Sequence, residues 1–288
     1  MYPLISYNHT LIDAQEVNIS PVNGGLLHGY GVFTTLRIYN GVPFQFNQHW
    51  IRLERHAHAI KLDIDDDLET QVHADLISLI DANQVVEGKA RITLLQRKSP
   101  FWQLADSKPG IEILIFTSPL QSRSQEVNLT ISPYRILSNS LNSIKTTAYL
   151  PQMLVLEEAQ KRGFDDAVVL NERGEVCETA IANIFWVRHR VLYTPTPSTG
   201  CLAGTTAGLV RKLAKELRIE STAGAFPAEH LLVADECFLT SSTREMVLVR
   251  SVNHKRFDGM PNSIFERLMF AFKKHVHIET FSKKKQQS

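Results

Sequence analysis

Apolar and polar positions alternate with two different periods in the first 118 residues, which predicts strands interrupted by two helices. Asn40-Gly41 is a hairpin-turn signal between two β-branched and aromatic segments. Asn47 is expected to cap the first helix, on which apolar positions recur at helical spacing. The predicted strands cover residues 31–39, 42–46, 90–96 and 111–116, and the predicted helices cover residues 49–60 and 68–82.

The second half of the chain has the same mixed pattern after a polar, proline-containing stretch at residues 119–125, which we interpret as a domain linker. Strands are predicted over residues 127–131, 167–170, 175–176, 184–187, 191–193 and 236–240, and helices over residues 151–163 and 204–217. The expected organisation is a small α/β domain (1–118), the linker (119–125), a larger domain (126–280) and a flexible tail (281–288). The fold class is therefore α/β in the broad sense, including α+β.

Composition and charge narrow the class of protein. The 288 residues are 43% hydrophobic and 21% charged, as in an ordinary globular protein, and the net charge of +1 gives no general attraction to nucleic acid or to an anionic membrane. The chain shows neither a signal-peptide pattern nor an apolar run long enough to span a membrane, so a cytoplasmic location is expected. No partner of either kind is predicted.

Cysteine and histidine positions exclude two common kinds of site. The three cysteines, Cys177, Cys201 and Cys237, are far apart and form no CxxC motif, so they are expected to be buried thiols rather than a disulfide framework. The pairs His56/His58 and His275/His277 lack further ligands at suitable spacing. No metal site is predicted.

Lys145 and Glu178 are the strongest candidates for chemistry. Lys145 lies in Ser143-Ile144-Lys145-Thr146-Thr147-Ala148-Tyr149-Leu150, and Glu178 follows at the start of a predicted hairpin. A lysine amine can form a Schiff base with an aldehyde, and a carboxylate can keep a pyridine nitrogen protonated. That is what pyridoxal phosphate chemistry needs. Each residue by itself has a plain alternative reading, as an exposed lysine or as a surface glutamate.

Three further segments are suited to bind a phosphate. Leu202-Ala203-Gly204-Thr205-Thr206 precedes a predicted helix, so free backbone N–H groups and the hydroxyls of Thr205 and Thr206 are expected together. Ser242 follows a strand in Ser241-Ser242-Thr243 and is a second source of hydroxyls. Arg52 supplies a guanidinium on the first helix. A helix cap and a surface arginine are the common alternatives.

These segments together resemble the motifs of the class IV aminotransferase family, the fold-type IV pyridoxal 5'-phosphate enzymes. The resemblance runs from about Asn8 to Val252 with the motifs in the family order. They are Gly29-Tyr30-Gly31-Val32-Phe33, His49-x-x-Arg52-Leu53, Ile144-Lys145, Glu178 with Asn183-Ile184-Phe185, Leu202-x-Gly204-x-Thr206, and Thr240-Ser241-Ser242-x-x-Glu245.

The resemblance implies a larger domain of pseudo-barrel form, a homodimer and pyridoxal 5'-phosphate as cofactor. It assigns the covalent link to Lys145, the pyridine nitrogen to Glu178, and the phosphate to Arg52 and to the serine and threonine hydroxyls named above. It places Tyr149 near the cofactor's phenolic oxygen, although core packing explains this tyrosine equally well. The chain departs from the family at Ala207, where an arginine is usual.

Within the family, the sequence is most similar to 4-amino-4-deoxychorismate lyases, which release 4-aminobenzoate and pyruvate. Phe33-Thr34-Thr35 resembles a lyase segment, and residues 96–101 lack the Arg-x-His element that D-amino-acid aminotransferases use to bind a carboxylate. An aminotransferase of branched-chain or D-amino acids with 2-oxoglutarate is the alternative, because Thr243-Arg244-Glu245-Met246 resembles the aminotransferase version. Thr243, Arg97 and Arg91 are candidate substrate contacts. A binding protein that kept the fold without activity stays open, whereas Gly29-x-Gly31 lacks the third glycine of a Rossmann enzyme.

Overall fold

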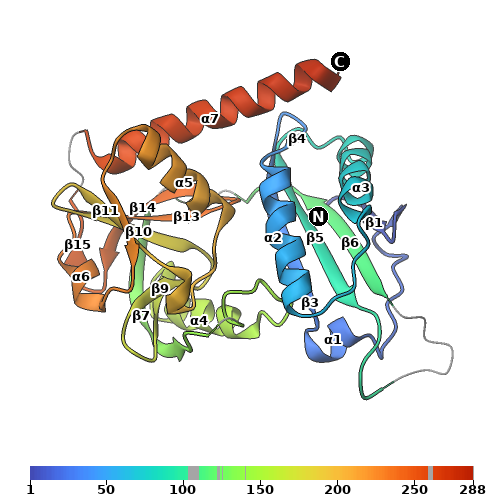
Figure 1. Cartoon of the computed structure of the whole chain (residues 1–288), viewed down its shortest axis with the longest axis horizontal. Coiled ribbons are helices and arrows are strands. Elements are labelled where there is room, and N and C mark those ends of the chain that lie inside the picture. Colours follow the sequence, from blue (N-terminus) through green and yellow to red (C-terminus); the bar gives the residue numbers. More distant parts are fainter. Residues whose placement is uncertain (103–109, 122–123, 125, 140, 259–261, 288) are drawn as a thin grey trace. The chain divides into compact units, whose positions relative to one another are not determined.

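The computed structural model describes residues 1–102, 110–121, 124, 126–139, 141–258 and 262–287. Its chain forms two compact units, each with its own sheet (Figure 1). Unit 1 comprises Met1–Gln121, Ile144–Tyr149 and Ile278–Ser288, and unit 2 comprises Ser122–Ser143 and Leu150–His277. The segment that contains Lys145 therefore belongs to unit 1, although it follows the expected linker in the sequence. Residues 122, 123 and 125 of that linker lie outside the described residues.

Unit 1 is built on a six-stranded sheet in the order β2-β1-β6-β5-β3-β4. Its strands are β1 (Leu4–Tyr7), β2 (Thr10–Asp13), β3 (Gly31–Tyr39), β4 (Val42–Pro43), β5 (Gly88–Gln96) and β6 (Ile111–Ser118). Its helices are α1 (Gly24–His28), α2 (Phe46–Ala59) and α3 (Leu68–Ala82). Helix α2 packs along β3, and α3 packs against β1 and β6 (Figure 1). The apolar faces of both helices and of the sheet make one core, which includes Leu36, Leu53 and Leu76.

Unit 2 contains a nine-stranded sheet within its described residues, with the path β12-β11-β10-β13-β14-β7-β8-β9 and β15 paired to β14. Its strands are β7 (Glu126–Ile136), β8 (Asp166–Asn171), β9 (Val176–Thr179), β10 (Asn183–Arg188), β11 (Val191–Pro195), β12 (Ser221–Gly224), β13 (Glu236–Ser241), β14 (Glu245–Val252) and β15 (Lys255–Arg256). Strand β9, at one end of the path, also lies against β10 and β11, so the sheet curls strongly upon itself. This arrangement confirms the expected fold class of a small α/β unit with a larger pseudo-barrel unit.

The helices of unit 2 are α4 (Leu150–Lys161), the 3-10 helix η1 (Pro197–Thr199), α5 (Thr205–Glu216), α6 (Ala228–Leu232) and α7 (Ile264–Gln287). Helix α7 continues beyond His277 into residues that group with unit 1. Its helical backbone thus includes nearly all of the segment 281–288 that we expected to be a tail. No helix in the described part of the chain is long and apolar enough to cross a membrane.

Two local predictions near α2 are wrong. Asn47 does not cap the helix, which begins at Phe46 with Gln45 as its N-cap residue. The return strand expected over residues 42–46 ends at Pro43. Phe46 is buried and stacks on Trp50 one turn later, with ring centroids 6.3 Å apart. Because of this packing the helix begins at Phe46, before Asn47. Side-chain burial therefore outweighs the capping preference of asparagine.

Candidate active site

The segment Ile144–Tyr149 lies along the free side of strand β3. The N–H of Phe33 donates to the carbonyl of Lys145 at 3.0 Å, and the N–H of Thr147 donates to the carbonyl of Gly31 at 2.9 Å. These bonds flank an antiparallel bridge between Val32 and Thr146. Lys145 is thus attached to the sheet of unit 1 by backbone bonds between residues far apart in the sequence.

Gly29 makes this close approach possible. Its φ of 62° lies in the left-handed region, and a Cβ at this position would lie 2.7 Å from the Cβ of Ala148. The carbonyl of Gly29 also accepts a hydrogen bond from the hydroxyl of Thr147 at 2.9 Å. Any larger residue would push the lysine segment away from β3, which gives the first glycine of the motif a physical role.

The amine of Lys145 lies beside two aromatic rings. Its Nζ is 4.6 Å from the ring centroid of Phe33 and 4.9 Å from that of Tyr149, and it contacts the Tyr149 hydroxyl at 3.5 Å. The two rings meet edge to face at 5.4 Å. The Tyr149 hydroxyl thus points toward the Lys145 amine, and its role beside a cofactor stays a prediction.

Arg91 joins the same group from β5. Its guanidinium lies 3.6 Å from the ring centroid of Phe33, on whose ring the lysine amine also rests, and its Nε donates to the hydroxyl of Thr93 at 3.1 Å. Burial lowers the pKa of Arg91 from its usual value, yet the group stays a cation at neutral pH. Among the described residues Arg91 forms no ion pair, so its charge is available to an anion.

Helix α2 places three polar side chains on its buried face. His49, Arg52 and His56 follow one another at helical spacing, and each is at most 6% exposed. Arg52 Nη2 donates to the hydroxyl of Thr34 at 2.9 Å, and that hydroxyl lies 2.6 Å from His49 Nδ1. Thr34 can accept from the arginine while it donates to a neutral histidine, so this chain of bonds orients the guanidinium.

Both histidines are held in the neutral form. Burial is the main cause, and the nearby charges of Arg52 and Lys145 add to it. The pKa of His49 falls well below its usual value, and the pKa of His56 falls to about 3. The same two cations act on both rings, which places Arg52 and Lys145 in one neighbourhood of unit 1. Sequence reasoning placed His56 at helical spacing with apolar residues and rejected it as a metal ligand, and it missed this role.

Arg97 lies in different surroundings from Arg91. Its Nη2 donates to the carbonyl of Ile111 at 3.0 Å, and its Nε is 3.8 Å from a carboxylate oxygen of Glu112. Burial raises the pKa of Glu112, and the charge of Arg97 opposes that rise. The guanidinium of Arg97 is thus committed to Glu112. Its role as a substrate contact stays a prediction.

In unit 2, Glu178 is held by the turn that precedes α5. Its Oε2 accepts a hydrogen bond from the N–H of Leu202 at 3.1 Å and a longer one from Asn183 Nδ2 at 3.4 Å. Asn183 also donates to the carbonyl of Leu202 at 2.7 Å. The carboxylate therefore has a fixed position, and the motif residue Asn183 provides part of it.

The start of helix α5 has the features of an anion site. Gly204 is its N-cap residue without a side-chain cap, so the first N–H groups of the helix have no acceptor within it. A Cβ at Gly204 would collide with Asn183 Oδ1, so a larger residue would displace the amide side chain that contacts Glu178. The hydroxyl of Thr205 lies 3.4 Å from that of Ser242, whereas Thr206 is buried. Predicted residues far apart in the sequence thus come together here.

The turn after β13 is held from two sides. Glu245 is buried and has a left-handed φ of 59°, and it forms an ion pair with Lys273 of α7. Arg244 donates to the carbonyl of Ser124 at 3.1 Å. Ser242 and Thr243 directly precede these two held residues and are only partly buried. The turn is therefore well placed to present hydroxyl and N–H groups to a ligand.

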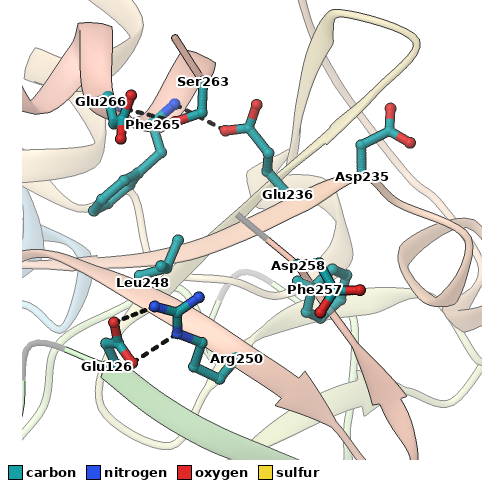
Figure 2. A pocket seen from close by; sticks show the side chains of 10 residues that line it. All are labelled: Glu126, Asp235, Glu236, Leu248, Arg250, Phe257, Asp258, Ser263, Phe265 and Glu266. Atoms are coloured by element: carbon teal, nitrogen blue, oxygen red, sulfur yellow. Dashed lines mark hydrogen bonds and ion pairs between the residues drawn. The ribbon is translucent and has the colours of Figure 1, made fainter. Parts of the chain in front are cut away.

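A pocket of about 520 Å³ lies elsewhere on unit 2 (Figure 2). It is lined by carboxylates with a few apolar side chains, and its arginine, Arg250, is paired with Glu126. It borders the start of β13, whereas Ser242 follows the end of that strand. None of the predicted site residues lines this pocket, and Glu236 in it caps α7 through the N–H groups of Ile264 and Phe265. We assign it no ligand.

The thiols are not part of the candidate chemistry. All three cysteines are buried and free, as expected from the sequence. Burial is the largest cause that raises the pKa of Cys177 and of Cys201, each to about 12. Neither thiol is a reactive nucleophile at neutral pH, even though both neighbour the Glu178 turn in the sequence.

Comparison with known proteins gives the family. The family described as "Amino-transferase class IV" matches residues 31–252. The chain is 28% identical to the aminodeoxychorismate lyase of Bacillus subtilis, over 95% of this chain and 94% of the relative. It is 31% identical to a putative branched-chain-amino-acid aminotransferase of Methanocaldococcus jannaschii, over 91% and 94%. The crystal structure of the Escherichia coli branched-chain amino acid aminotransferase has the same fold, with a TM-score of 0.86, 24% identity and coverage of 95% and 94%.

The chain belongs to the class IV aminotransferase family, and its cofactor is pyridoxal 5'-phosphate. The local structure fits this cofactor. Unit 1 supplies an amine beside two aromatic rings, and unit 2 supplies a fixed carboxylate and a helix start without a side-chain cap. What the motifs alone did not reveal is how Thr34 and His49 orient Arg52 and how His56 binds the backbone of Lys145.

Proposed function

We propose that this member of the class IV aminotransferase family is an aminodeoxychorismate lyase, which converts 4-amino-4-deoxychorismate to 4-aminobenzoate and pyruvate. The observation that carries the proposal is the likeness to the Bacillus subtilis lyase, at 28% identity over 95% of this chain. Arg91 fits it, as a cation that forms no ion pair among the described residues and that rests on the same Phe33 ring as the Lys145 amine. A substrate with carboxylates suits this position.

The proposed roles of the cofactor-binding residues follow from their surroundings. Lys145 would attach the cofactor covalently, and its amine, once released, would take up and return the substrate proton. Glu178 would hold a proton on the pyridine nitrogen, because Leu202 and Asn183 fix its carboxylate. When bound, the cofactor supplies a ring that withdraws electrons from the substrate. Tyr149 would orient the amine by its hydroxyl contact.

The phosphate would be bound by charge and by hydroxyls together. Arg52 is oriented by Thr34, and its guanidinium would provide the positive charge. The N–H groups that begin α5 and the hydroxyls of Thr205, Thr206 and Ser242 would provide the remaining donors. Of these hydroxyls, Thr205 and Ser242 have the stronger support, since they lie together at the partly exposed helix start.

The substrate carboxylates are assigned to Arg91 and to the backbone N–H of Thr243. Arg91 is preferred to Arg97, whose guanidinium already faces Glu112. Elimination of pyruvate needs the carboxylates held while the proton leaves, so a fixed cation near the base contributes orientation as well as affinity. Loss of the ring substituent yields an aromatic product, which makes the reaction favourable without a second substrate.

An aminotransferase of branched-chain or D-amino acids with 2-oxoglutarate is the second candidate. The turn Thr243-Arg244-Glu245-Met246 favours it by its resemblance, and the Methanocaldococcus jannaschii relative carries a putative aminotransferase name. Arg91 would then bind a carboxylate of 2-oxoglutarate. The two activities share every cofactor-binding residue named above, so only the substrate separates them.

The enzyme is proposed to act as a homodimer in the cytoplasm. Helix α4 of unit 2 buries only Val155 and Ala159 of its apolar side chains, and it exposes Leu150, Met153 and Leu154 at 67%, 50% and 47%. Such a run of exposed apolar side chains is typical of a surface that another protein covers. Sedimentation of the wild type and of a Leu150→Glu, Leu154→Glu variant would report whether a second copy does so.

A parallel assay of the purified enzyme tests the proposed activity. One arm offers aminodeoxychorismate and measures pyruvate and 4-aminobenzoate, which are expected in equal amounts. The other arm offers branched-chain and D-amino acids with 2-oxoglutarate and measures glutamate. Transamination without release of 4-aminobenzoate would overturn the lyase assignment, and Lys145→Ala serves as the blank in both arms.

A further inference from the structure

The backbone of Lys145 is held on two opposite sides. On one side its carbonyl accepts from the N–H of Phe33 on β3, at 3.0 Å. On the other side its N–H donates to Nδ1 of His56 on helix α2, at 3.1 Å. The bonds to β3 attach the segment along one strand of the sheet. The His56 bond adds an attachment at Lys145 itself from a second element, and α2 is packed against β3 through the unit 1 core.

His56 is suited to accept and unsuited to carry charge. Its side chain is 3% exposed, and the cations Arg52, Arg55 and Lys145 all lie near it. These cations and burial keep the imidazole neutral, with its proton on Nε2 and the lone pair of Nδ1 directed at the Lys145 N–H. A protonated ring would have no acceptor to offer. The bond therefore persists over the whole physiological pH range.

We infer that His56 is a positioning residue for Lys145, whose backbone N–H it binds so that the reactive amine starts from a fixed point. This inference rests on the proposed role of Lys145 as the cofactor-binding base, and it assigns His56 no contact with the cofactor or substrate. A lysine side chain has many rotamers, so the place of its Cα limits where the amine can reach. Small displacements of a base slow the proton transfer much more than they weaken substrate binding.

The test compares three variants of the cofactor-loaded enzyme. His56→Leu removes the acceptor but keeps an apolar side chain of similar size in the buried site. His56→Asn keeps an acceptor oxygen near the place of Nδ1. His58→Leu is the matched control, because His58 is exposed on the same helix. Thermal unfolding of each variant shows that differences in the other readouts do not come from unfolded protein.

The direct readout is hydrogen exchange of the Lys145 amide, followed in enzyme labelled with [15N]lysine and assigned with a Lys145→Arg sample. We expect exchange about tenfold faster in His56→Leu than in the wild type, and within about threefold of the wild type in His56→Asn and His58→Leu. In the same preparations kcat should fall about tenfold in His56→Leu, with KM changed by less than about twofold. His56→Asn should recover most of kcat.

Two results would overturn the inference. One is wild-type exchange of the Lys145 amide in His56→Leu. The other is a His56→Asn enzyme as impaired as His56→Leu, since an acceptor at this position would then be irrelevant. Failure of the proposed function gives a different result. Borohydride reduction followed by peptide mapping would place the cofactor on another lysine, and the exchange data would still report the His56 bond.

Discussion

The two units hold their candidate residues by different means. In unit 1 the chemistry is carried by long side chains, Lys145 and Arg52, and each is steadied by buried neutral partners on regular elements. In unit 2 one carboxylate, Glu178, is fixed by the turn before α5, and the other candidate groups are short hydroxyls and backbone N–H groups at the start of α5 and in the turn after β13. A flexible cation needs a rigid neighbour to be placed, whereas a turn places its own backbone groups. Changes of single side chains should therefore have their largest effects at Lys145, Glu178 and Arg52.

The removal of the amine tests the central assignment of unit 1. Lys145→Ala should lower turnover at least about 10³-fold, because no other base would be placed to move the substrate proton. The visible absorbance of the covalently bound cofactor should disappear as well. Lys161→Ala, at an exposed lysine of α4, is the control and should leave both unchanged. A yellow, active Lys145→Ala enzyme would place the covalent link elsewhere.

The next change tests the fixed carboxylate of unit 2. Glu178→Gln should slow turnover by about 10²- to 10³-fold, since an amide cannot keep the pyridine nitrogen protonated. Cofactor affinity should change little, because the glutamine oxygen can still accept the N–H of Leu202. Steady-state kinetics and a cofactor titration separate the two effects. Equal rates in the variant and the wild type would rule out the proposed role.

The loss of a single charge in unit 1 should appear in binding rather than in chemistry. Arg52→Ala removes a charge-assisted contact to the phosphate, which costs about 1.5–3 kcal/mol of cofactor binding free energy. The dissociation constant should rise by about 10- to 150-fold in a fluorescence titration. Arg55→Ala, on the exposed side of the same helix, should bind as the wild type does. If both variants bound alike, the phosphate would depend on unit 2 alone.

The buried histidine should make the stability of unit 1 sensitive to acid. The pKa of His56 is about 3 in the folded protein and about 6.5 when unfolded, so between these values the unfolded state binds more protons. Stability is then complete above pH 6.5 and falls as the pH drops toward 3. Between pH 3 and 6.5, His56→Leu should reduce the slope of the unfolding free energy against pH by about 1.4 kcal/mol per pH unit. Urea unfolding of both proteins at pH 5 and 7 measures the difference. An equal loss of stability from pH 7 to pH 5 in the two proteins would contradict a buried neutral ring.

Much of the local structure could be predicted from the sequence, because its signals are short-range. The Asn40-Gly41 turn, the α5 start at Gly204-Thr205 and the motif around Lys145 are each contained within a few residues. Helix α7 was also visible in principle, since Ile264, Leu268, Phe272 and Val276 recur at intervals of one turn and are all buried.

What the sequence could not supply are contacts between distant segments. The bridge of Val32 to Thr146 and the bond of Lys145 to His56 join residues with no common pattern. His56 has neither a partner nor a purpose until the lysine segment lies beside it. The distinction between Arg91 and Arg97 is of the same kind. Both are arginines of one stretch, and only the fold shows that Glu112 lies beside the second.

The path of the chain has a consequence for its synthesis on the ribosome. Met1–Gln121 emerges first, yet the edge of β3 gains its partner only when Ile144–Tyr149 follows, after the first strand of the other unit has been made. Nascent domains generally fold as units from the N-terminus. This one must wait with an open strand edge, so a fragment cut at residue 121 would lack both its reactive amine and the cover of that edge. Such a fragment is expected to aggregate, and a chaperone that binds exposed strand edges is expected to bind it.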